Sequence, residues 1–253
     1  MSIAIGICNR VHSALADPAC CTRLKGLGIT AIQLDLRLAE AKYSLSSPDI
    51  RARWTEEAAR AGLRLSGIAV SEVLHRAMTA DPGTRPRADA EQAITLAIEC
   101  AAAMGVPKVV IPSLAASAVR NADDLRHTAR CLRLACALAS SKGVLVATEN
   151  NLAADEARSL LAVVGYANLC VMPDCSGPAA LPRDLLARAG GEACAWAVPP
   201  ETSGAFAGLK SEGFVGCIFL ANSRQTEENG PALFAGIARD AGALRALWQT
   251  LPD

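Results

Sequence analysis

Short apolar runs alternate with longer amphipathic runs along the whole chain, and no other feature of the sequence constrains the fold as strongly. Such apolar runs are typical of buried parallel strands, because both faces of these strands are covered by other elements. The longer runs have the apolar spacing of amphipathic helices. The expected strands are residues 2–8, 30–36, 63–70, 108–113, 143–151, 168–174, 193–198 and 213–220.

Eight strand–helix units in 253 residues predict an α/β fold, a (β/α)8 TIM barrel, with residues 1–253 forming a single domain. An open, doubly wound sheet is the alternative, and such sheets usually carry a glycine-rich turn after the first strand. Residues 8–12, which read CNRVH, contain no glycine, and this favours the barrel. Only residues 206–212 are left for a helix between strands seven and eight, so we expect a shortened helix there.

The most loop-like part of the sequence lies between the third strand and the next helix. Residues 81–90 read DPGTRPRADA, and prolines and glycines in such a run interrupt helices. We therefore expect a loop from Val73 to Pro86 and a helix over residues 88–104 that ends at Gly105. The sequence does not reveal whether this loop acts as a lid.

Charge and composition exclude several classes of partner. The formal net charge is zero, aromatic residues make up 4% of the chain, and no basic stripe of the kind that binds nucleic acid is present. No stretch approaches the roughly 20 apolar residues that span a bilayer, and the first residues lack the pattern of a signal peptide. We therefore expect a cytoplasmic protein with a small-molecule substrate, no nucleic acid and no membrane, and a homo-oligomer is left open.

Ten cysteines are a high count for a chain of this length. None of them forms a CxxC pair, and most lie in apolar segments, where cysteine behaves as a small hydrophobic residue. We therefore expect reduced thiols in the core rather than a disulfide framework, which is typical of short secreted chains. Cys175 follows an acidic residue directly and is the one cysteine singled out as a candidate for chemistry.

The fifth expected strand, GVLVATENN, ends in a carboxylate flanked by amides. A charge in a dry core is costly unless it is paired or bound to a metal. We therefore interpret Glu149 as leaving the core at the mouth of the barrel, where the active sites of TIM barrels lie. This position makes Glu149 the first candidate for a functional residue.

The same rule ranks the polar residues that follow the other strands. Asp174 follows strand six, and two carboxylates in one mouth share a cation or hold a proton between them. A turn or a helix cap before Gly177 is the structural alternative for Asp174, and Arg224 could clamp an anion. The further candidates are Glu72 and His75 for catalysis and Asn150, Glu201, Asn222 and Arg224 for substrate binding.

Three short segments carry a resemblance to a known family. Thr148-Glu149-Asn150-Asn151, Met172-Pro173-Asp174 and Gly213-Phe214-Val215-Gly216 are similar to segments of the xylose-isomerase-like TIM-barrel superfamily, which contains sugar isomerases, sugar epimerases and endonuclease-IV-like proteins. The resemblance implies one divalent metal ion (Mn, Mg or Zn) bound by a glutamate, an aspartate, a histidine and a second glutamate. Glu149 matches the first glutamate and Asp174 the aspartate.

The remaining ligands of that family site have no counterpart in the sequence. Ala221 stands where the second glutamate is expected, and residues 195–200, which read AWAVPP, lack the histidine. The resemblance therefore implies a degenerate metal site. Two glutamates on opposite faces of the substrate carry out epimerisation in this family, so Ala221 removes the usual second group. Glu72, Glu201 or His75 could supply this group, and Glu72 or Glu201 could replace the lost metal ligands.

Two functions are left open by the sequence. The first is a sugar isomerase or epimerase with a rebuilt site, in which Glu149 is the general base and acts next to a carbonyl of a small carbohydrate or polyol. The second is a non-catalytic barrel that binds a small molecule or partner after loss of the family's metal site. The Glu149-Asn150 pair favours the first function, and the missing ligands favour the second.

Overall fold

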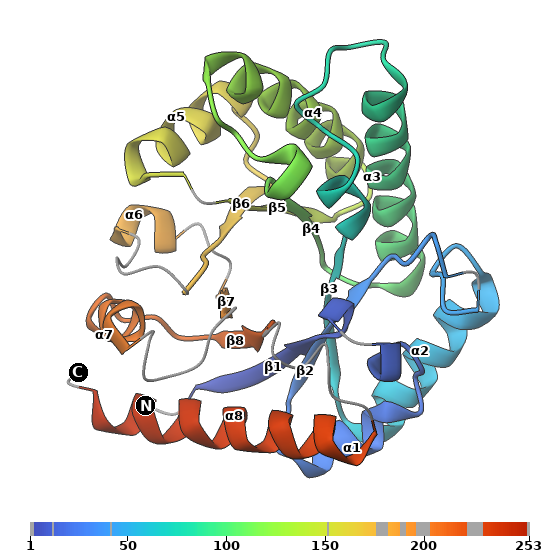
Figure 1. The fold of residues 1–253 in the computed structure, drawn as a ribbon, viewed down its shortest axis with the longest axis vertical. Coiled ribbons are helices and arrows are strands. Elements are labelled where there is room, and N and C mark those ends of the chain that lie inside the picture. The colour runs from blue at the N-terminus through green and yellow to red at the C-terminus, as the bar shows by residue number, and fades with distance from the viewer. Residues whose placement is uncertain are drawn as a thin grey trace. The chain divides into compact units, whose positions relative to one another are not determined.

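A computed structural model of the chain describes residues 3–11, 13–40, 42–150, 152–175, 182–187, 191–195, 203–221 and 230–251. Strands and helices alternate through it, and this order confirms the α/β fold of the (β/α)8 TIM-barrel class (Figure 1). The strands are β1 (Ala4–Cys8), β2 (Ala31–Asp35), β3 (Arg64–Ala69), β4 (Lys108–Pro112), β5 (Leu145–Glu149), β6 (Leu169–Met172), β7 (Glu192–Ala195) and β8 (Cys217–Leu220).

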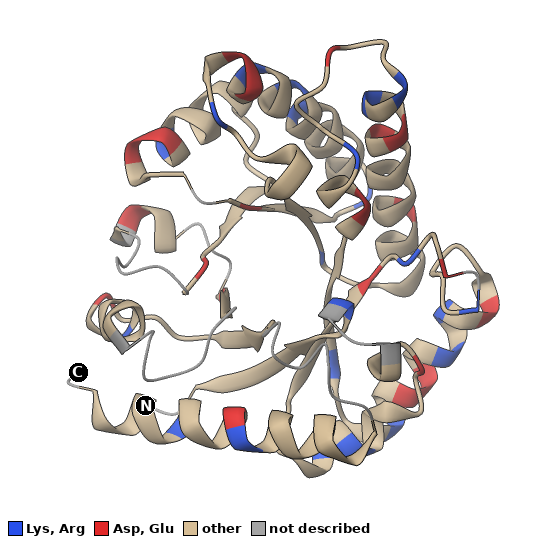
Figure 2. Ribbon diagram, viewed as in Figure 1, with Lys and Arg blue, Asp and Glu red and all other residues tan. Residues whose placement is uncertain are grey.

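The helices between the strands carry most of the charged residues, whereas the strands are largely uncharged (Figure 2). They are α1 (Cys20–Gly26), α2 (Pro48–Ala61), α3 (Arg85–Met104), α4 (Ala122–Ser140), α5 (Ala154–Val164), α6 (Arg183–Leu186), α7 (Ser203–Ser211) and α8 (Pro231–Thr250). Four short 3-10 turns, η1 to η4, cover Asn9–Val11, Ser13–Leu15, Ser71–Leu74 and Ala115–Ser117.

Backbone contacts divide the chain into two compact units. The first unit consists of Met1–Leu34, Ala52–Ser66 and Pro173–Asp253, and the second of Asp35–Arg51 and Gly67–Met172. In the first unit β1 pairs with β2 and with β8, and β8 pairs with β7. In the second unit β4 pairs with β3 and with β5, and β5 pairs with β6. All six pairings are parallel, as expected for strands connected by helices.

The approach to β8 in the first unit explains the glycine–aromatic–x–glycine segment of the sequence. Gly213 has a φ of +74°, a left-handed conformation that glycine adopts without the penalty of a side chain. A Cβ atom at Gly216 would collide with the backbone carbonyl of Gly191. The two glycines are therefore required by the local backbone that leads into the strand.

The second unit has a core of apolar strand residues covered by α3, α4 and α5 (Figure 1). Helix α3 packs against β4, and α4 packs against β5 and against both neighbouring helices. Every residue of β4 is buried, including Lys108, and β5 is buried except at Leu145. These strands are buried on both faces, which is the reason for their continuous apolar sequence.

Some element boundaries differ from those that the sequence predicts. Helix α3 begins at Arg85 rather than at residue 88, because Thr84 adopts the extended conformation of an N-cap and Pro86 is tolerated in the first turn. The short helix before β8 is present as α7, with nine residues, and it begins at Ser203 rather than at residue 206. Helix α6 is shorter still, with four residues.

All ten cysteines are free and buried, which confirms the expectation of reduced core thiols. Burial raises the pKa of the Cys175 thiol, and the neighbouring charge of Asp174 raises that pKa further. The thiol of Cys175 is therefore in its neutral, unreactive form at neutral pH. Among the residues that the structure describes, no helix is both long and apolar enough to cross a bilayer.

Candidate functional site

The strand register of the second unit brings the ends of β4 and β5 to one level. Ala69, the last residue of β3, pairs with Val110, and Val110 pairs with Ala147. Two residues further along, β4 ends at Pro112 and β5 ends at Glu149, whereas Ser71 already begins η3. Because neighbouring strands lie about 4.8 Å apart, the backbones of β3 and β5 are separated by about 10 Å.

Glu149 is the last residue of β5, as the sequence predicts, but it is not exposed at a mouth. Only 1% of its surface is accessible, so the interpretation that it has left the core is wrong. It pairs with Pro112 on one side and with Met172 on the other, and its carbonyl oxygen accepts a hydrogen bond of 2.7 Å from the Ser113 N–H. A buried carboxylate at a strand end is a stronger candidate for chemistry than an exposed one.

The residues beside Glu149 form a chain of polar contacts. The hydroxyl groups of Ser113 and Thr148 are 3.4 Å apart, and both residues are fully buried. The amide nitrogen of Asn150 donates to the Thr148 hydroxyl at 3.4 Å, and its amide oxygen accepts from the Leu152 N–H at 3.2 Å. These contacts fix the Asn150 side chain directly after the candidate base.

Glu72 lies in η3, directly after β3, and it presents one oxygen without a partner. Its Oε1 accepts a hydrogen bond of 2.7 Å from the backbone N–H of Leu38. Its Oε2 is buried and has no hydrogen-bond partner among the described residues, and the same is true of the Ser71 hydroxyl. An unpartnered buried carboxylate oxygen is costly in a folded protein. It therefore indicates an atom that is available to a substrate or a proton.

The segment after β2 borders the same region of the second unit. Asp35 accepts a hydrogen bond of 3.3 Å from the Ser71 N–H, and Arg37 donates to Glu40 at 2.6 Å. Arg37 is 6% exposed and has a φ of +52°. This left-handed conformation costs a residue with a Cβ atom about 1–2 kcal/mol. Strain of this kind at the end of a strand is typical of functional positions.

Of the other predicted site residues, the structure describes His75 and Asp174. His75 is exposed, on the C-terminal side of η3. Asp174 belongs to the first unit, where it forms a parallel bridge with Cys194, and the residues with which it would form the expected turn or helix cap lie outside the described part of the chain. Glu201, Asn222 and Arg224 lie outside the described residues.

The structure also bears on the expected metal ligands. Ala221 is fully buried after β8, and its N–H donates to the carbonyl oxygen of Ala195. Its methyl group cannot act as a ligand. The described residues contain no group of three or more histidine, cysteine, aspartate or glutamate side chains that could hold a metal ion. A hard divalent cation takes about six oxygen ligands, so these residues do not by themselves fit a resident ion.

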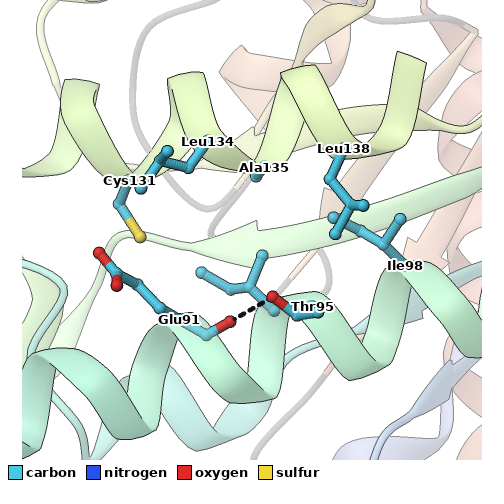
Figure 3. Close-up of a pocket in the computed structure, with 8 residues that line it drawn as sticks. Glu91, Thr95, Ile98, Cys131, Leu134, Ala135 and Leu138 are labelled. Carbon is cyan, nitrogen blue, oxygen red and sulfur yellow. Dashed lines mark hydrogen bonds between the residues drawn. The ribbon is translucent and has the colours of Figure 1, made fainter. Parts of the chain in front are cut away.

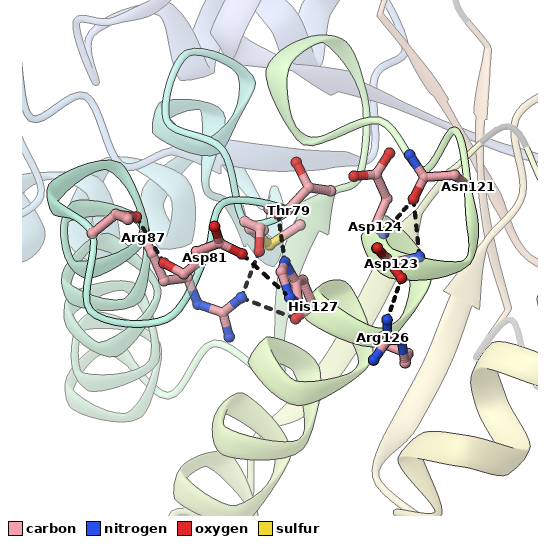
Figure 4. Close-up of polar contacts among 10 residues, drawn as sticks. Thr79, Asp81, Arg87, Asn121, Asp123, Asp124, Arg126 and His127 are labelled. Atoms are coloured by element: carbon pink, nitrogen blue, oxygen red, sulfur yellow. Dashed lines mark hydrogen bonds and ion pairs between the residues drawn. The ribbon is translucent and has the colours of Figure 1, made fainter.

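The loop between Val73 and Pro86 is held in place by polar contacts (Figure 4). Ser117 donates to the Val73 carbonyl oxygen at 2.6 Å and accepts from the Met78 N–H at 2.9 Å. On the other side, His127 lies 2.7 Å from the Thr79 carbonyl oxygen. These contacts tie the first half of the loop to η4 and α4. His127 therefore has a structural role far from the strand ends.

Two features of this group, at Glu72 and at Arg37, have no signal in the sequence. The Glu72 carboxylate is held through Oε1 by the N–H of Leu38, which is 34 residues away in the chain, and this leaves Oε2 without a partner among the described residues. A positive φ is expected mainly at glycine or asparagine, so the sequence does not indicate the positive φ at Arg37.

Comparison with known proteins gives the family context of this geometry. Residues 21–177 match the family described as Xylose isomerase-like TIM barrel. A curated relative, the 2-epi-5-epi-valiolone 7-phosphate 2-epimerase of Actinoplanes sp., is 28% identical over 152 residues, which are 60% of this chain and 54% of that protein. The match therefore spans about half the length of the curated relative.

Solved structures with the same fold cover nearly the whole chain. D-psicose 3-epimerase from Clostridium cellulolyticum H10 has a TM-score of 0.71 at 14% identity and covers 97% of this chain and 99% of its own. The 3-keto-D-glucoside 4-epimerase of E. coli has a TM-score of 0.70 at 14% identity, and the match covers 96% of this chain and 99% of that protein. At this identity, the similarity establishes the fold.

Proposed function

The chain belongs to the xylose isomerase-like TIM barrel family, and from this premise we propose that it is a sugar isomerase or epimerase. The substrate is a small carbohydrate or polyol, and the reaction is proton transfer next to a carbonyl. The observation that carries the proposal is the carboxylate of Glu149, which is 1% exposed at the end of β5. The curated relative and the two similar structures are all named as epimerases, which supports this class of reaction.

Glu149 is the general base of the proposed reaction. Its carboxylate takes the proton from the carbon next to the carbonyl, and the electron pair of the broken C–H bond moves into the carbonyl to form an enediolate. Return of the proton to the former carbonyl carbon, together with transfer of the hydroxyl proton from one oxygen of the enediolate to the other, completes an isomerisation, for which one base is enough. Asn150, held by Thr148 and Leu152, is placed to bind a hydroxyl group of the substrate.

Epimerisation needs a second group, because the proton must return to the opposite face of the carbon. Glu72 is the residue that we assign to this step, since Ala221 supplies no carboxylate. In its protonated form, Glu72 donates the proton from Oε2, while Oε1 stays bonded to the Leu38 N–H. Glu72 follows β3 and Glu149 ends β5, the two strands on either side of β4. The proposed epimerisation requires that the two carboxylates reach opposite faces of the enediolate.

A divalent ion bound by Glu149 and Asp174 remains a prediction, because the structure describes the two residues in separate units. Such an ion would polarise the carbonyl oxygen of the substrate. Titration of Mn, Mg and Zn into chelator-treated protein measures its contribution. The proton transfers assigned to Glu149 and Glu72 do not depend on this ion.

Solvent exchange tests the proposed function directly. The intact protein is incubated in D2O with D-psicose, 3-keto-D-glucoside and 2-epi-5-epi-valiolone 7-phosphate, and deuterium at the carbon next to the carbonyl is followed by NMR. We expect exchange with at least one of these compounds and a loss of about 10³-fold in its rate in Glu149→Gln. The control is Glu99→Gln, which changes an exposed glutamate of α3.

Two results would count against the proposal. Exchange in Glu149→Gln at the rate of the wild type would remove Glu149 from the mechanism. Absence of exchange with ketoses, their phosphates and cyclic ketones, with and without added metal, would instead favour a non-catalytic binding protein.

A further inference from the structure

A surface hollow lies over helices α3 and α4 of the second unit. Its apolar part, with a volume of about 210 Å³, is lined by Ile94 and Ile98 from α3 and by Leu134 and Leu138 from α4. Leu138 faces Ile98 at one end of this groove, and Glu91 lies beside Cys131 at the other (Figure 3). Leu134 is 60% exposed, so the apolar groove is open to solvent there.

A second, polar part of the hollow adjoins the apolar groove, because Glu91 and Leu134 line both. It has a volume of about 420 Å³, within the range of about 300–1,000 Å³ that is typical of small-molecule sites. Arg87 of α3, Arg130 and Arg133 of α4 and the half-buried Tyr166 contribute to its lining.

The three arginines differ in their partners. Arg87 is 2% exposed; its Nε donates to Glu91 at 2.6 Å, so these two charges balance. Arg130 and Arg133 are exposed, and within the described part of the chain neither guanidinium group has an ion pair or a hydrogen bond. They are spaced i,i+3 on α4, where like charges destabilise a helix.

Other arginines on neighbouring surfaces are paired within their own turn. Arg126 binds Asp123 on α4, and Arg158 binds Asp155 on α5 at 2.7 Å. No acidic residue lies three or four positions from Arg130 or Arg133, so the helix itself cannot supply a partner. Two positive charges next to an apolar groove are therefore left without compensation.

We propose that this hollow binds a phosphate monoester that carries an apolar substituent. A phosphate monoester has a charge of about −1.5 to −2 at pH 7, which matches the two uncompensated arginines. Guanidinium groups bind phosphate oxygens through paired hydrogen bonds, and the Tyr166 hydroxyl adds a donor. The apolar substituent packs over Leu134 into the groove between α3 and α4. The site is separate from the strand-end carboxylates and goes beyond the proposed function.

Calorimetric titration of the intact protein tests this site, with inorganic phosphate and n-butyl phosphate as probes at low ionic strength. We expect saturable binding of both, with n-butyl phosphate about tenfold tighter because its alkyl chain leaves water. The double variant Arg130→Ala/Arg133→Ala should weaken both by at least about tenfold. The matched control is Arg126→Ala, which removes a paired arginine from the same helix and should leave binding unchanged.

The Glu149→Gln variant separates this site from the strand ends. It should bind both probes as tightly as the wild type, and the double arginine variant should retain the solvent exchange of the wild type. Loss of binding in Glu149→Gln would place the phosphate at the strand ends and overturn the inference, while leaving the proposed function intact.

Three other results would overturn the inference. The first is the absence of saturable binding of either probe up to about 10 mM. The second is equal affinity of the double variant and the wild type. The third is a loss of affinity in Arg126→Ala as large as that in the double variant, which would indicate attraction by net charge alone. Equal affinity for the two probes would remove the apolar groove from the site.

Discussion

The backbone N–H of Leu38 donates a hydrogen bond of 2.7 Å to Oε1 of Glu72. Leu38 follows β2 by three residues and Glu72 follows β3 by three, so the bond connects two strand ends. It holds one carboxylate oxygen and leaves Oε2 buried without a described partner. Because the donor belongs to the backbone, a glutamine at this position can accept the same bond through its amide oxygen.

The Glu72→Gln variant should therefore separate inversion from proton removal. It keeps the bond to Leu38 but cannot donate a carboxylic proton, so we expect the rate of epimer formation to fall about 10²-fold or more. Solvent exchange by Glu149 should persist, and the free energy of unfolding should change by less than about 1 kcal/mol. NMR of substrate in D2O measures both rates in one sample. A parallel loss of exchange and inversion would show that Glu72 acts elsewhere in the reaction.

Replacement of Arg87 by leucine should destabilise the second unit. The guanidinium donates to the carbonyl oxygens of Met78 and His127 as well as to Glu91, and all three acceptors lose their donor. Because the Glu91 side chain is 39% exposed and regains water, we expect a loss of about 2–3 kcal/mol, at or below the usual range for breaking a buried pair.

Urea unfolding measures this loss, and α3 provides its own control. The Arg85 side chain is 92% exposed and lies 4.0 Å from Asp89, so Arg85→Leu should change stability by less than about 0.5 kcal/mol. Equal effects of the two substitutions would show that the buried contacts of Arg87 contribute little.

Ala115→Gly should stabilise the protein. Ala115 is exposed and has a φ of +51°, which is unfavourable for a residue with a Cβ atom. Relief of this strain exceeds the entropic cost of glycine, so we expect a gain of about 0.5–1 kcal/mol. Ala137→Gly, at an exposed position inside α4, should instead lose about 1 kcal/mol. Thermal unfolding of the two variants gives the sign of each change.

Stability should fall when the pH rises above 9. Burial raises the pKa of Cys131 from 9.0 to about 11. Arg87 lowers this pKa and Glu91 raises it, both by smaller amounts. Between these values the unfolded chain releases the thiol proton and the folded chain keeps it. The contribution of Cys131 is therefore fully present below pH 9 and is lost as the pH approaches 11.

A shift of this size corresponds to about 2–3 kcal/mol. Urea unfolding of the wild type and of Cys131→Ala at pH 8 and pH 11 measures it. The variant should lose less stability between the two pH values by about this amount. An identical fall in both proteins would show that other groups cause the pH dependence.

The sequence by itself was sufficient for the fold class and for several features of the candidate site. The alternation of apolar and amphipathic runs predicted eight strand–helix units, and Glu149 was correctly placed at the end of the fifth strand. Burial of all ten cysteines also followed from their apolar neighbours. These features are readable because periodicity and strand ends are local properties of the chain.

Tertiary structure decided how each of these residues is surrounded. Glu149 was expected at an exposed mouth and is instead buried at the end of β5, 1% exposed. The Glu72 carboxylate is held by an N–H group 34 residues away in the chain. The hollow beside Arg130 exists only because α3 packs against α4. Burial and hydrogen-bond partners come from residues distant in sequence, and a local pattern contains no record of them.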